Sequence, residues 1–373
     1  PAHGGGRAGL EACVAIEALH EVSAIDKLLS AFIGPLQGDN ISTQPGRWGS
    51  LHRVHCSLNI NTETGRLSAR RPNLQNQPAL EKDRYHVRKA FSADTAAGHT
   101  LVVADYGQLE LRILAHMAAC SSMMTAFELG GDFHSRTAYA MYDYIRADVE
   151  AGTCLIEKEK GKEDLPQLKD KYASERRKAK ILNFSIAYGK TAHGLAKDFG
   201  TSLEEAKDTV AKWYADRKEV QAWQEETRER ARKEAGEPFV STILGRRRPL
   251  PDMRSDEWSK KGHAERAAIN TPIQGSAADV ASSAMVAIDK CPRLKALGFR
   301  LIMQVHDEVI LEGPKAHADE AKQLVVAHMA NPWEWWMRKA QEEGRAPPPV
   351  KGRPLRVELA VDCKSADTWY EAK

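Results

Sequence analysis

The stretch L-V-V-A-D-Y-G-Q-L-E-L-R, residues 101–112, changes its hydrophobic period at Asp105. The four apolar or small residues before it predict a short buried strand, and apolar residues recur at helical spacing from Leu109 onward. Asp105 therefore stands where a strand gives way to a helix, and Glu110 follows within about one turn. A lone Asp at such a place is also a common helix N-cap, so its interpretation depends on a second acidic site.

That second site is residues 301–311, L-I-M-Q-V-H-D-E-V-I-L, where two apolar runs flank His306, Asp307 and Glu308. The pattern predicts a strand, a tight turn and a strand, with two adjacent acids that repel each other unless a cation is present. If the hairpin lies beside the strand that ends at Asp105, two carboxylates converge, as a site for a pair of Mg²⁺ ions requires. An exposed polar hairpin tip fits the same spacing.

Composition sets limits on the class of protein. A chain of 373 residues suggests two or three domains, and the net charge of +3 leaves room for a basic face. Basic residues cluster at 176–180, 246–248 and 260–266, which suits a polyanionic partner, although each cluster alone also fits a solvated surface. The six cysteines lack C-x-x-C and zinc spacing, which favours a reducing compartment.

The ends and hydropathy of the chain point away from a membrane protein. No apolar run is long enough to cross a bilayer, and no signal peptide is recognised. The N-terminal letters P-A-H-G-G-G-R-A-G suggest a flexible lead or a cut site, so we expect the chain to begin partway through a larger protein.

Periodicity predicts a mixed order of helices and strands. We expect a helix over 10–36 with an apolar stripe, a mainly helical region over 118–261, an exposed insertion at 148–172, helices over 173–188 and 203–235, a strand pair within 239–250 that turns at Gly245, a helix over 264–289 that Pro272 kinks or divides, a helix over 315–329, and a closing strand at 356–361.

Two sets of side chains recur at helical spacing. Arg176, Lys180, Phe184 and Tyr188 fall four residues apart, so they form a slowly winding stripe on one side of a helix. Two cations and two aromatic rings suit the phosphates and the base of a nucleotide, but a split between core and solvent fits equally well. His134, near a predicted helix start, is either a phosphate contact or a packed surface histidine.

The second set consists of arginine and amide side chains that could read the minor groove of a duplex, whose acceptors recur across A·T and T·A pairs. For each amide alone, a local hydrogen bond is the simpler explanation. The set comprises Arg266, Asn270 and Gln274 on one helix, with Arg66, Asn73, Gln75 and Asn76 upstream.

Together these stretches resemble the family A (Pol I-like) DNA polymerases. D-Y-G-Q-L-E-L-R resembles motif A of that family, R-R-K-A-K-I-L-N-F-S-I-A-Y-G resembles motif B, and Q-V-H-D-E-V resembles motif C, in the family's order. T-G-R-L-S-A-R-R-P-N-L-Q-N-Q-P and R-A-A-I-N-T-P-I-Q-G-S-A-A-D are similar to further family blocks. The residues within these blocks are most similar to those of the plant and algal organellar branch of the family, which implies that the protein acts in a plastid, a mitochondrion or both.

The resemblance implies an α+β, right-hand fold with a palm built on an antiparallel sheet, helical fingers and a truncated helical thumb. The expected boundaries are 1–56 for a remnant of thumb and linker, 57–112 for the first part of the palm, 113–261 for the fingers and 262–373 for the second part of the palm. Only the last thumb helix is recognised and no 3′–5′ exonuclease domain precedes it, so we expect a weak grip on the template and no proofreading.

The resemblance also implies roles for individual residues in adding dNTPs to a primer 3′-hydroxyl. Asp105 and Asp307 would bind two Mg²⁺ ions, or Mn²⁺ as a substitute, beside Glu308, and Lys180 would protonate the leaving pyrophosphate. The nucleotide would be held by Arg176, Lys180, Phe184, Tyr188, His134, Glu110 and Gln108, with Glu110 as the steric gate against ribose. Primer–template DNA would contact Arg66, Asn73, Gln75, Asn76, Arg266, Asn270, Gln274 and His306.

Two departures from the family pattern are Gly107 for a commoner serine and Ser185 for a commoner glycine beside Phe184. Phe184 itself implies strong rejection of dideoxynucleotides. A related RNA polymerase or reverse transcriptase is the first alternative, against which Glu110 and motif B argue. A non-catalytic DNA-binding subunit is the second, and it would be expected to lack one of the three acids. Helicase or single-strand binding partners cannot be read from the sequence.

Overall fold

The apolar run before Asp105 forms the central strand of a four-stranded antiparallel sheet with the order β10-β5-β9-β8. The structure, a computed structural model, describes residues 6–38, 43–45, 52–78, 80, 83–158, 161, 164–344 and 355–373. The strands of this sheet are β5 (His99–Tyr106), β8 (Arg300–Val305), β9 (Glu308–Pro314) and β10 (Val361–Ala366). The predicted strand at Asp105 and the predicted hairpin at 301–311 are therefore confirmed.

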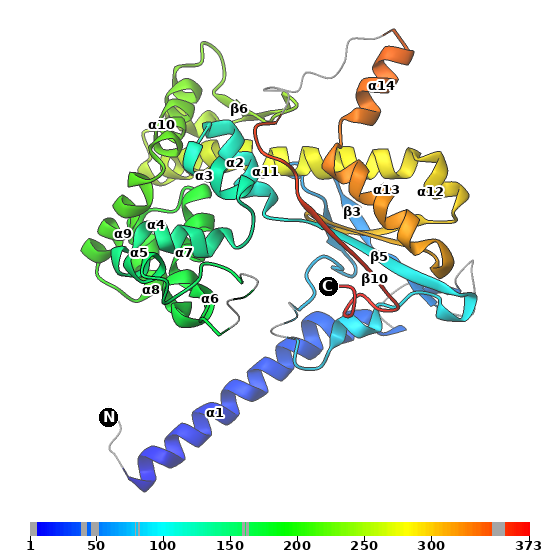
Figure 1. Cartoon of the computed structure of the whole chain (residues 1–373), viewed down its shortest axis with the longest axis horizontal. Helices are drawn as coiled ribbons and strands as arrows, with labels where there is room; N and C mark the ends of the chain where they lie inside the picture. Colours follow the sequence, from blue (N-terminus) through cyan, green and yellow to red (C-terminus); the bar gives the residue numbers. More distant parts are fainter. Residues whose placement is uncertain are drawn as a thin grey trace.

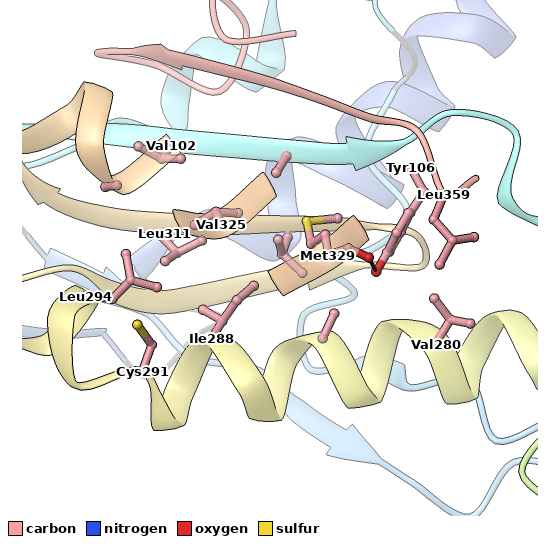
Figure 2. Close-up of a cluster of buried hydrophobic side chains, with 14 of the residues drawn as sticks. Val102, Tyr106, Val280, Ile288, Cys291, Leu294, Leu311, Val325, Met329 and Leu359 are labelled. Atoms are coloured by element: carbon pink, nitrogen blue, oxygen red, sulfur yellow. Dashed lines mark hydrogen bonds between the residues drawn. The ribbon is translucent and has the colours of Figure 1, made fainter. Parts of the chain in front are cut away.

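One face of the sheet packs on the helices α11 (Trp258–Lys290) and α13 (Ala318–Ala330), and the core lies between them (Figure 2). Val102, Tyr106 and Leu311 point into this core from the sheet, and the Tyr106 hydroxyl donates to the Met329 carbonyl at 2.8 Å. A fully buried aliphatic side chain contributes about 1.5–3 kcal/mol, so this layer holds the sheet in place.

The opposite face of the sheet is covered by the turn that follows β10. Leu101, Val103 and Ile310 form a cluster there with the fully buried Trp369. Because side chains alternate along a strand, Asp105 and Glu308 lie on this same face. The acids are thus separated from the large core on the helical side.

A body of helices follows β5 along the chain and lies to one side of the sheet (Figure 1). Its core includes Trp213, Leu182, Ile186 and Met123, all fully or almost fully buried. The helices are α2 (Leu109–Ala118), α3 (Ser121–Glu128), α4 (Phe133–Met141), α5 (Asp143–Glu150), α6 (Leu168–Lys171), α7 (Ala173–Ala187), α8 (Ala192–Phe199), α9 (Leu203–Ala215) and α10 (Lys218–Lys233). The prediction of a helix over 173–188 is confirmed by α7.

Short hairpins, two further α-helices and the 3₁₀ turns Val87–Ala90, Thr95–Ala97, Pro251–Arg254 and Lys315–His317 lie in the rest of the described chain. The hairpins pair β1 (Thr43–Pro45) with β2 (His52–Val54), β3 (Ser57–Asn59) with β4 (Ser68–Arg70), and β6 (Phe239–Ser241) with β7 (Arg247–Pro249). The last of these confirms the predicted strand pair within 239–250. The other helices are α12 (Pro292–Ala296) and α14 (Glu334–Glu342).

Helix α1 (Arg7–Leu28) extends away from the rest of the molecule (Figure 1). Irregular helical turns continue it to Leu36, but none of its residues is buried, so the predicted apolar stripe faces solvent. Residues 7–9 of the predicted flexible lead belong to this helix, and residues 1–5 lie outside the described residues. No helix in the described ranges is both long enough and apolar enough to cross a membrane.

The prediction of one helix over 203–235 is wrong, because the chain breaks between α9 and α10 at Asp216 and Arg217. Arg217 is only 2% exposed, its guanidinium lies 4.8 Å from the centroid of the Trp213 ring, and it donates to Thr137 Oγ1 at 3.1 Å. The backbone at Arg217 leaves the helical conformation, with φ of −138° and ψ of 51°, at the point where this side chain enters the helical core.

Three further predictions need correction. Pro272 does not divide α11, because the helix runs through a densely buried stretch whose packing offsets the hydrogen bond that proline removes. The closing strand starts at Val361, where the prediction ends it, since residues 356–360 bond instead to Arg112 of α2 and to Gly107 in the turn before that helix. Within the predicted exposed insertion, Leu168 and Cys154 are fully buried.

Arg246 joins the β3–β4 hairpin to α11, and it provides a test of how the fold is held together. Its guanidinium donates to the Thr64 carbonyl at 2.7 Å, to the Gly275 carbonyl at 3.0 Å and to Asp279 Oδ1 at 2.9 Å. Arg246→Met leaves the buried Asp279 without its cation, so we expect the free energy of unfolding to fall by about 2–3 kcal/mol in urea titrations. The exposed neighbour provides the control. Arg247→Met loses a contact with the Phe239 ring, whose centroid lies 4.4 Å from the guanidinium, so it should lower the free energy of unfolding by less than about 1 kcal/mol. Equal losses would contradict this role of Arg246.

Candidate active site

The acids predicted from the sequence meet where β5 ends and the β8–β9 hairpin turns. Asp105 pairs in register with Glu308, and the Tyr106 amide donates to the Asp307 carbonyl at 3.2 Å. His306 adopts a left-handed conformation, with φ of 58°, which allows the tight turn that presents Asp307. The structure therefore brings the carboxyl groups of Asp105, Asp307 and Glu308 to one end of the sheet.

The environment of Asp105 and Asp307 suits a hard divalent cation. Burial, with the negative charge of Asp105, raises the pKa of Asp307 to about 7. Asp105 Oδ1 is buried and has no hydrogen-bond partner among the described residues. An unpaired carboxylate oxygen beside a carboxyl group that resists ionisation is an arrangement that a bound cation would stabilise.

The residues around these carboxylates do not by themselves form a complete cage for a metal. Among the described residues, no group of three or more His, Cys, Asp or Glu side chains could hold an ion. Mg²⁺ usually keeps water or substrate phosphates as its other ligands, so a site with two protein carboxylates fits it without such a group.

Glu308 is buried and bonded within the protein. It is 1% exposed; Trp369 Nε1 donates to its Oε1 at 2.5 Å, and Lys373 forms an ion pair with its Oε2. Lys373 Nζ also lies 3.4 Å from Asp105 Oδ2. Glu308 is thus an acidic neighbour of the pair with both of its oxygens already bonded.

Glu110 is held between two partners at the start of α2. Its Oε1 forms an ion pair with Arg66, and its Oε2 accepts a hydrogen bond from the Tyr188 hydroxyl. Glu110 is only 8% exposed, and burial together with this carboxylate raises the pKa of Tyr188. Residues from three distant parts of the sequence are therefore fixed beside the end of β5, next to Gln108, which precedes α2 in a left-handed conformation.

Of the predicted stripe, Arg176 and Phe184 face the start of α4, whereas Tyr188 follows the last residue of α7 and bonds to Glu110. The Phe184 ring lies 5.7 Å from the His134 ring, and His134 Nδ1 is 3.0 Å from Asn183 Nδ2. Burial, with the positive charges of Arg176 and Lys180, lowers the pKa of His134 to about 4, so its ring is neutral near pH 7. Lys180 is exposed and has no carboxylate partner in the described part of the chain.

Arg176 forms an ion pair with Asp132, the residue that caps α4. Asp132 also accepts from the His134 amide at 3.2 Å and from Ser135 Oγ at 2.5 Å. This carboxylate therefore ties the start of α4 to α7, and an anion that enters here would compete with it for Arg176.

The predicted minor-groove residues divide into two groups. Gln75 is bonded within the protein: its side-chain Nε2 donates to Gln304 Oε1 at 3.0 Å, and its Oε1 accepts from the backbone amide of Ala69 at 3.1 Å. Asn73 Oδ1 accepts from the backbone amide of Gln75 at 3.1 Å. For these two residues the local hydrogen bonds are present.

Of the other members of this set, Arg66 forms the ion pair with Glu110, and the remaining ones keep free polar atoms or face solvent. Asn76 and Arg266 are exposed, Gln274 is half-buried, and Asn270 Oδ1 is buried with no hydrogen-bond partner in the described ranges. Arg266, Asn270 and Gln274 lie along α11, and Gly189 at the end of α7 approaches the Arg266 backbone. An unpaired amide oxygen on this helix is suited to accept a ligand donor.

Sequence reasoning missed Lys373, Trp369, Asp132 and Asn183. Only Asp132 had a local signal, because an Asp before Phe133 and the following periodic residues is typical of an N-cap. Lys373 and Trp369 reach the site through the turn after β10, and no spacing within the sequence reveals a contact with residues more than 60 positions away.

The shifted pKa of Asp307 predicts a pH dependence of stability in the protein without divalent ions. Because the pKa in the folded protein lies near 7, above the ordinary 3.8, the stabilising contribution is present at low pH and is lost as pH rises through about 7. At about 1.4 kcal/mol per tenfold change in the equilibrium constant, the loss is at most about 4 kcal/mol. Urea unfolding in EDTA at about pH 5 and about pH 8 measures the part of this loss that falls above pH 5, which is at most about 3 kcal/mol.

Asp307→Asn should flatten this pH dependence. Asp362→Asn should leave it as in the parent, because Asp362, which stands opposite Asp105 in the register of β10 with β5, is exposed. An unchanged pH dependence in Asp307→Asn would show that this carboxyl group does not titrate as its environment implies.

Comparisons with known proteins agree with this geometry. The chain is 56% identical over 376 residues to "DNA polymerase I A, chloroplastic" of Oryza sativa subsp. japonica, covering 100% of this chain and 34% of that protein. It is 57% identical over 376 residues to "DNA polymerase I B, chloroplastic/mitochondrial" of Arabidopsis thaliana, with the same coverage. The thermostable DNA polymerase I of Thermus aquaticus is 35% identical over 364 residues, 97% of this chain and 37% of that protein.

A solved structure shares the fold. The POL domain of Pol1 from M. smegmatis, in complex with DNA primer-template and dNTP, superimposes with a TM-score of 0.70 and 30% identity over 95% of this chain and 52% of that one. This likeness confirms the predicted polymerase fold. The chain spans about a third of the length of the curated relatives named above. The profile of DNA polymerase family A matches residues 10–371, and the chain therefore belongs to this family.

Proposed function

We propose that this chain catalyses template-directed addition of dNTPs to a primer 3′-hydroxyl. The observation that carries the proposal is the meeting of Asp105 and Asp307 at the end of the sheet, with one oxygen of Asp105 buried and unpaired among the described residues. Two carboxylates in this arrangement, in a chain of family A, suit nucleotidyl transfer assisted by divalent ions.

Asp105 and Asp307 would hold two Mg²⁺ ions, with Mn²⁺ as a substitute. When bound, these ions would lower the pKa of the primer 3′-hydroxyl and offset the negative charge of the phosphates. Asp307 must lose its proton before it can act as a ligand, and its pKa of about 7 places that step near neutral pH. Glu308, bonded to Trp369 and Lys373, fixes the neighbouring strand ends.

The side chains on α4 and α7 would bind the triphosphate. Lys180, exposed and without a carboxylate partner in the described chain, is available to contact the phosphates and to protonate the leaving pyrophosphate. Arg176 would exchange Asp132 for a phosphate, and the neutral His134 would donate a hydrogen bond. Phe184 and Tyr188 would lie against sugar and base, next to Gln108.

DNA would lie along α11 and the segment after β3. The exposed Arg266, the unpaired oxygen of Asn270 and the half-buried Gln274 suit the edges of a duplex, together with Arg66, Asn76 and His306. We propose 57–112 and 262–373 as the palm, 113–261 as the fingers and 1–56 as the thumb remnant and linker. Since the named plant relatives carry chloroplastic and mitochondrial names, we propose an organelle as the site of action.

Primer extension on a primed DNA template with Mg²⁺ tests this function. Asp307→Asn should lower the rate at least about 10³-fold, because one of the two carboxylates that would hold the divalent ions is lost. Asp362→Asn is the matched control, since it changes an exposed acid opposite Asp105 and should keep the parent's rate.

The outcomes are distinct. Extension by the parent and by Asp362→Asn, but not by Asp307→Asn, supports both the reaction and the metal site. Equal extension by Asp307→Asn and the parent would reject the role of Asp307, and a folded parent that binds primed DNA without extending it would reject the proposed reaction.

Glu110 predicts the sugar selectivity of the reaction. Its carboxylate is fixed by Arg66 and Tyr188, so a ribose 2′-hydroxyl that enters the same space would clash with it. Glu110→Ala should lower the preference for dNTPs over rNTPs about 100-fold in single-turnover extension. Tyr188→Phe should have a smaller effect, because the ring remains and only one bond to Glu110 is lost. Glu358→Ala, at an exposed position, is the control and should keep the parent's preference for dNTPs. An unchanged preference in an active Glu110→Ala variant would contradict the role of Glu110 as the gate.

A further inference from the structure

A lysine from the turn after β10 reaches into the acidic end of the sheet. The Lys373 ammonium forms ion pairs with Glu308 and with Asp105 Oδ2, the latter at 3.4 Å. Its side chain is 34% exposed, whereas Glu308 is almost fully buried. A cation of the protein itself therefore lies among the carboxylates to which a divalent ion would bind.

The turn that carries Lys373 is firmly anchored. Trp369 is fully buried, and its amide donates to the Phe91 carbonyl at 2.9 Å. The Arg88 guanidinium lies 4.1 Å from the centroid of the Trp369 ring, and the indole Nε1 donates to Glu308. The ammonium is thus held at a defined place by a packed aromatic residue on the same turn.

The contacts divide the carboxylate oxygens into two sets. Both oxygens of Glu308 are bonded, and Asp105 Oδ2 faces Lys373. Asp105 Oδ1 remains unpaired among the described residues. The Lys373 ammonium lies 3.4 Å from Asp105 Oδ2, and in this partly buried place its positive charge strongly opposes the binding of a divalent cation to Asp105.

We propose that Lys373 is a positioning residue that restrains divalent-ion binding by the nucleotide-free protein. Its ammonium occupies Oδ2 of Asp105 and neutralises Glu308, so that Asp105 Oδ1 and Asp307 are left for the ion. Tight binding then depends on the phosphates of an incoming nucleotide. This inference rests on the proposed metal site, and it adds a residue that competes with the ion for one of its ligands.

Mn²⁺ titration of the nucleotide-free protein, with free Mn²⁺ followed by its EPR signal, tests the proposal without any turnover. Lys373→Met should bind Mn²⁺ about tenfold more tightly than the parent, because one opposing charge is removed. Lys373→Arg keeps the charge and should stay within about twofold. Lys364→Met is the matched control, since Lys364 lies on β10 and pairs with the exposed Asp362 at 3.6 Å, and it should bind as the parent does.

Lys373→Met leaves the buried Glu308 without its cation, so a second comparison guards against loss of the fold. Glu308→Gln and the double variant Glu308→Gln/Lys373→Met differ only in the lysine and leave no unpaired buried glutamate. The double variant should bind Mn²⁺ about tenfold more tightly than Glu308→Gln. Equal affinities within this folded pair would overturn the proposal.

Asp307→Asn separates this inference from the proposed function. If Asp307→Asn binds Mn²⁺ as the parent does, the metal site itself is rejected. If binding depends on Asp307 but is the same with and without Lys373, only the role of Lys373 is rejected.

Discussion

The register between β5 and β9 is the constraint on which the rest of the site depends. Asp105 stands opposite Glu308 because Val103 pairs with Ile310 and Leu101 with Glu312, all on one face of the sheet. A slip of one residue would turn Asp105 toward the core of α11 and α13, where a carboxylate would be strongly unfavourable. Burial of the apolar residues on both faces, together with the bond from Tyr106 to Met329, fixes this register.

Placing acids at a buried sheet end requires nearby cations, and the fold supplies them from distant segments. Glu110 is paired with Arg66 and Glu308 with Lys373, which also lies close to Asp105. Asp307 has no ion-pair partner among the described residues, and burial together with the charge of Asp105 raises its pKa. The electrostatics therefore single out Asp307 as the carboxyl group with most to gain from a bound cation.

The sequence predicted those features that depend on neighbours in the chain. The change of period at Asp105 marks the β5–α2 junction, and the two apolar runs around His306 mark the β8–β9 hairpin. It failed where tertiary contacts override the local pattern. Arg217 breaks a continuous helical pattern to enter the core, and buried packing carries α11 through Pro272.

In the candidate site, too, the sequence predicted the residues that local patterns mark, and it missed those that only tertiary contacts bring in. Motif spacing supplied the acids and the stripe on α7, whereas their partners Asp132 and Lys373 are visible only once the chain is folded. Each of these partners belongs to a different element from the residue that it neutralises. A pattern within one helix or strand carries no information about such a pairing.

These pairings share one property that bears on catalysis. In the protein without ligands, Arg176 is bound to Asp132, Glu110 to Arg66 and Tyr188, and Glu308 to Lys373. In the proposed reaction, a nucleotide would arrive with divalent ions and bring both charges that these groups can bind, so that phosphate would replace Asp132 at Arg176 and Asp105 and Asp307 would hold the ions. Charges would then be exchanged between partners at fixed positions and would not be left buried alone, which would keep the reorganisation energy of the site small.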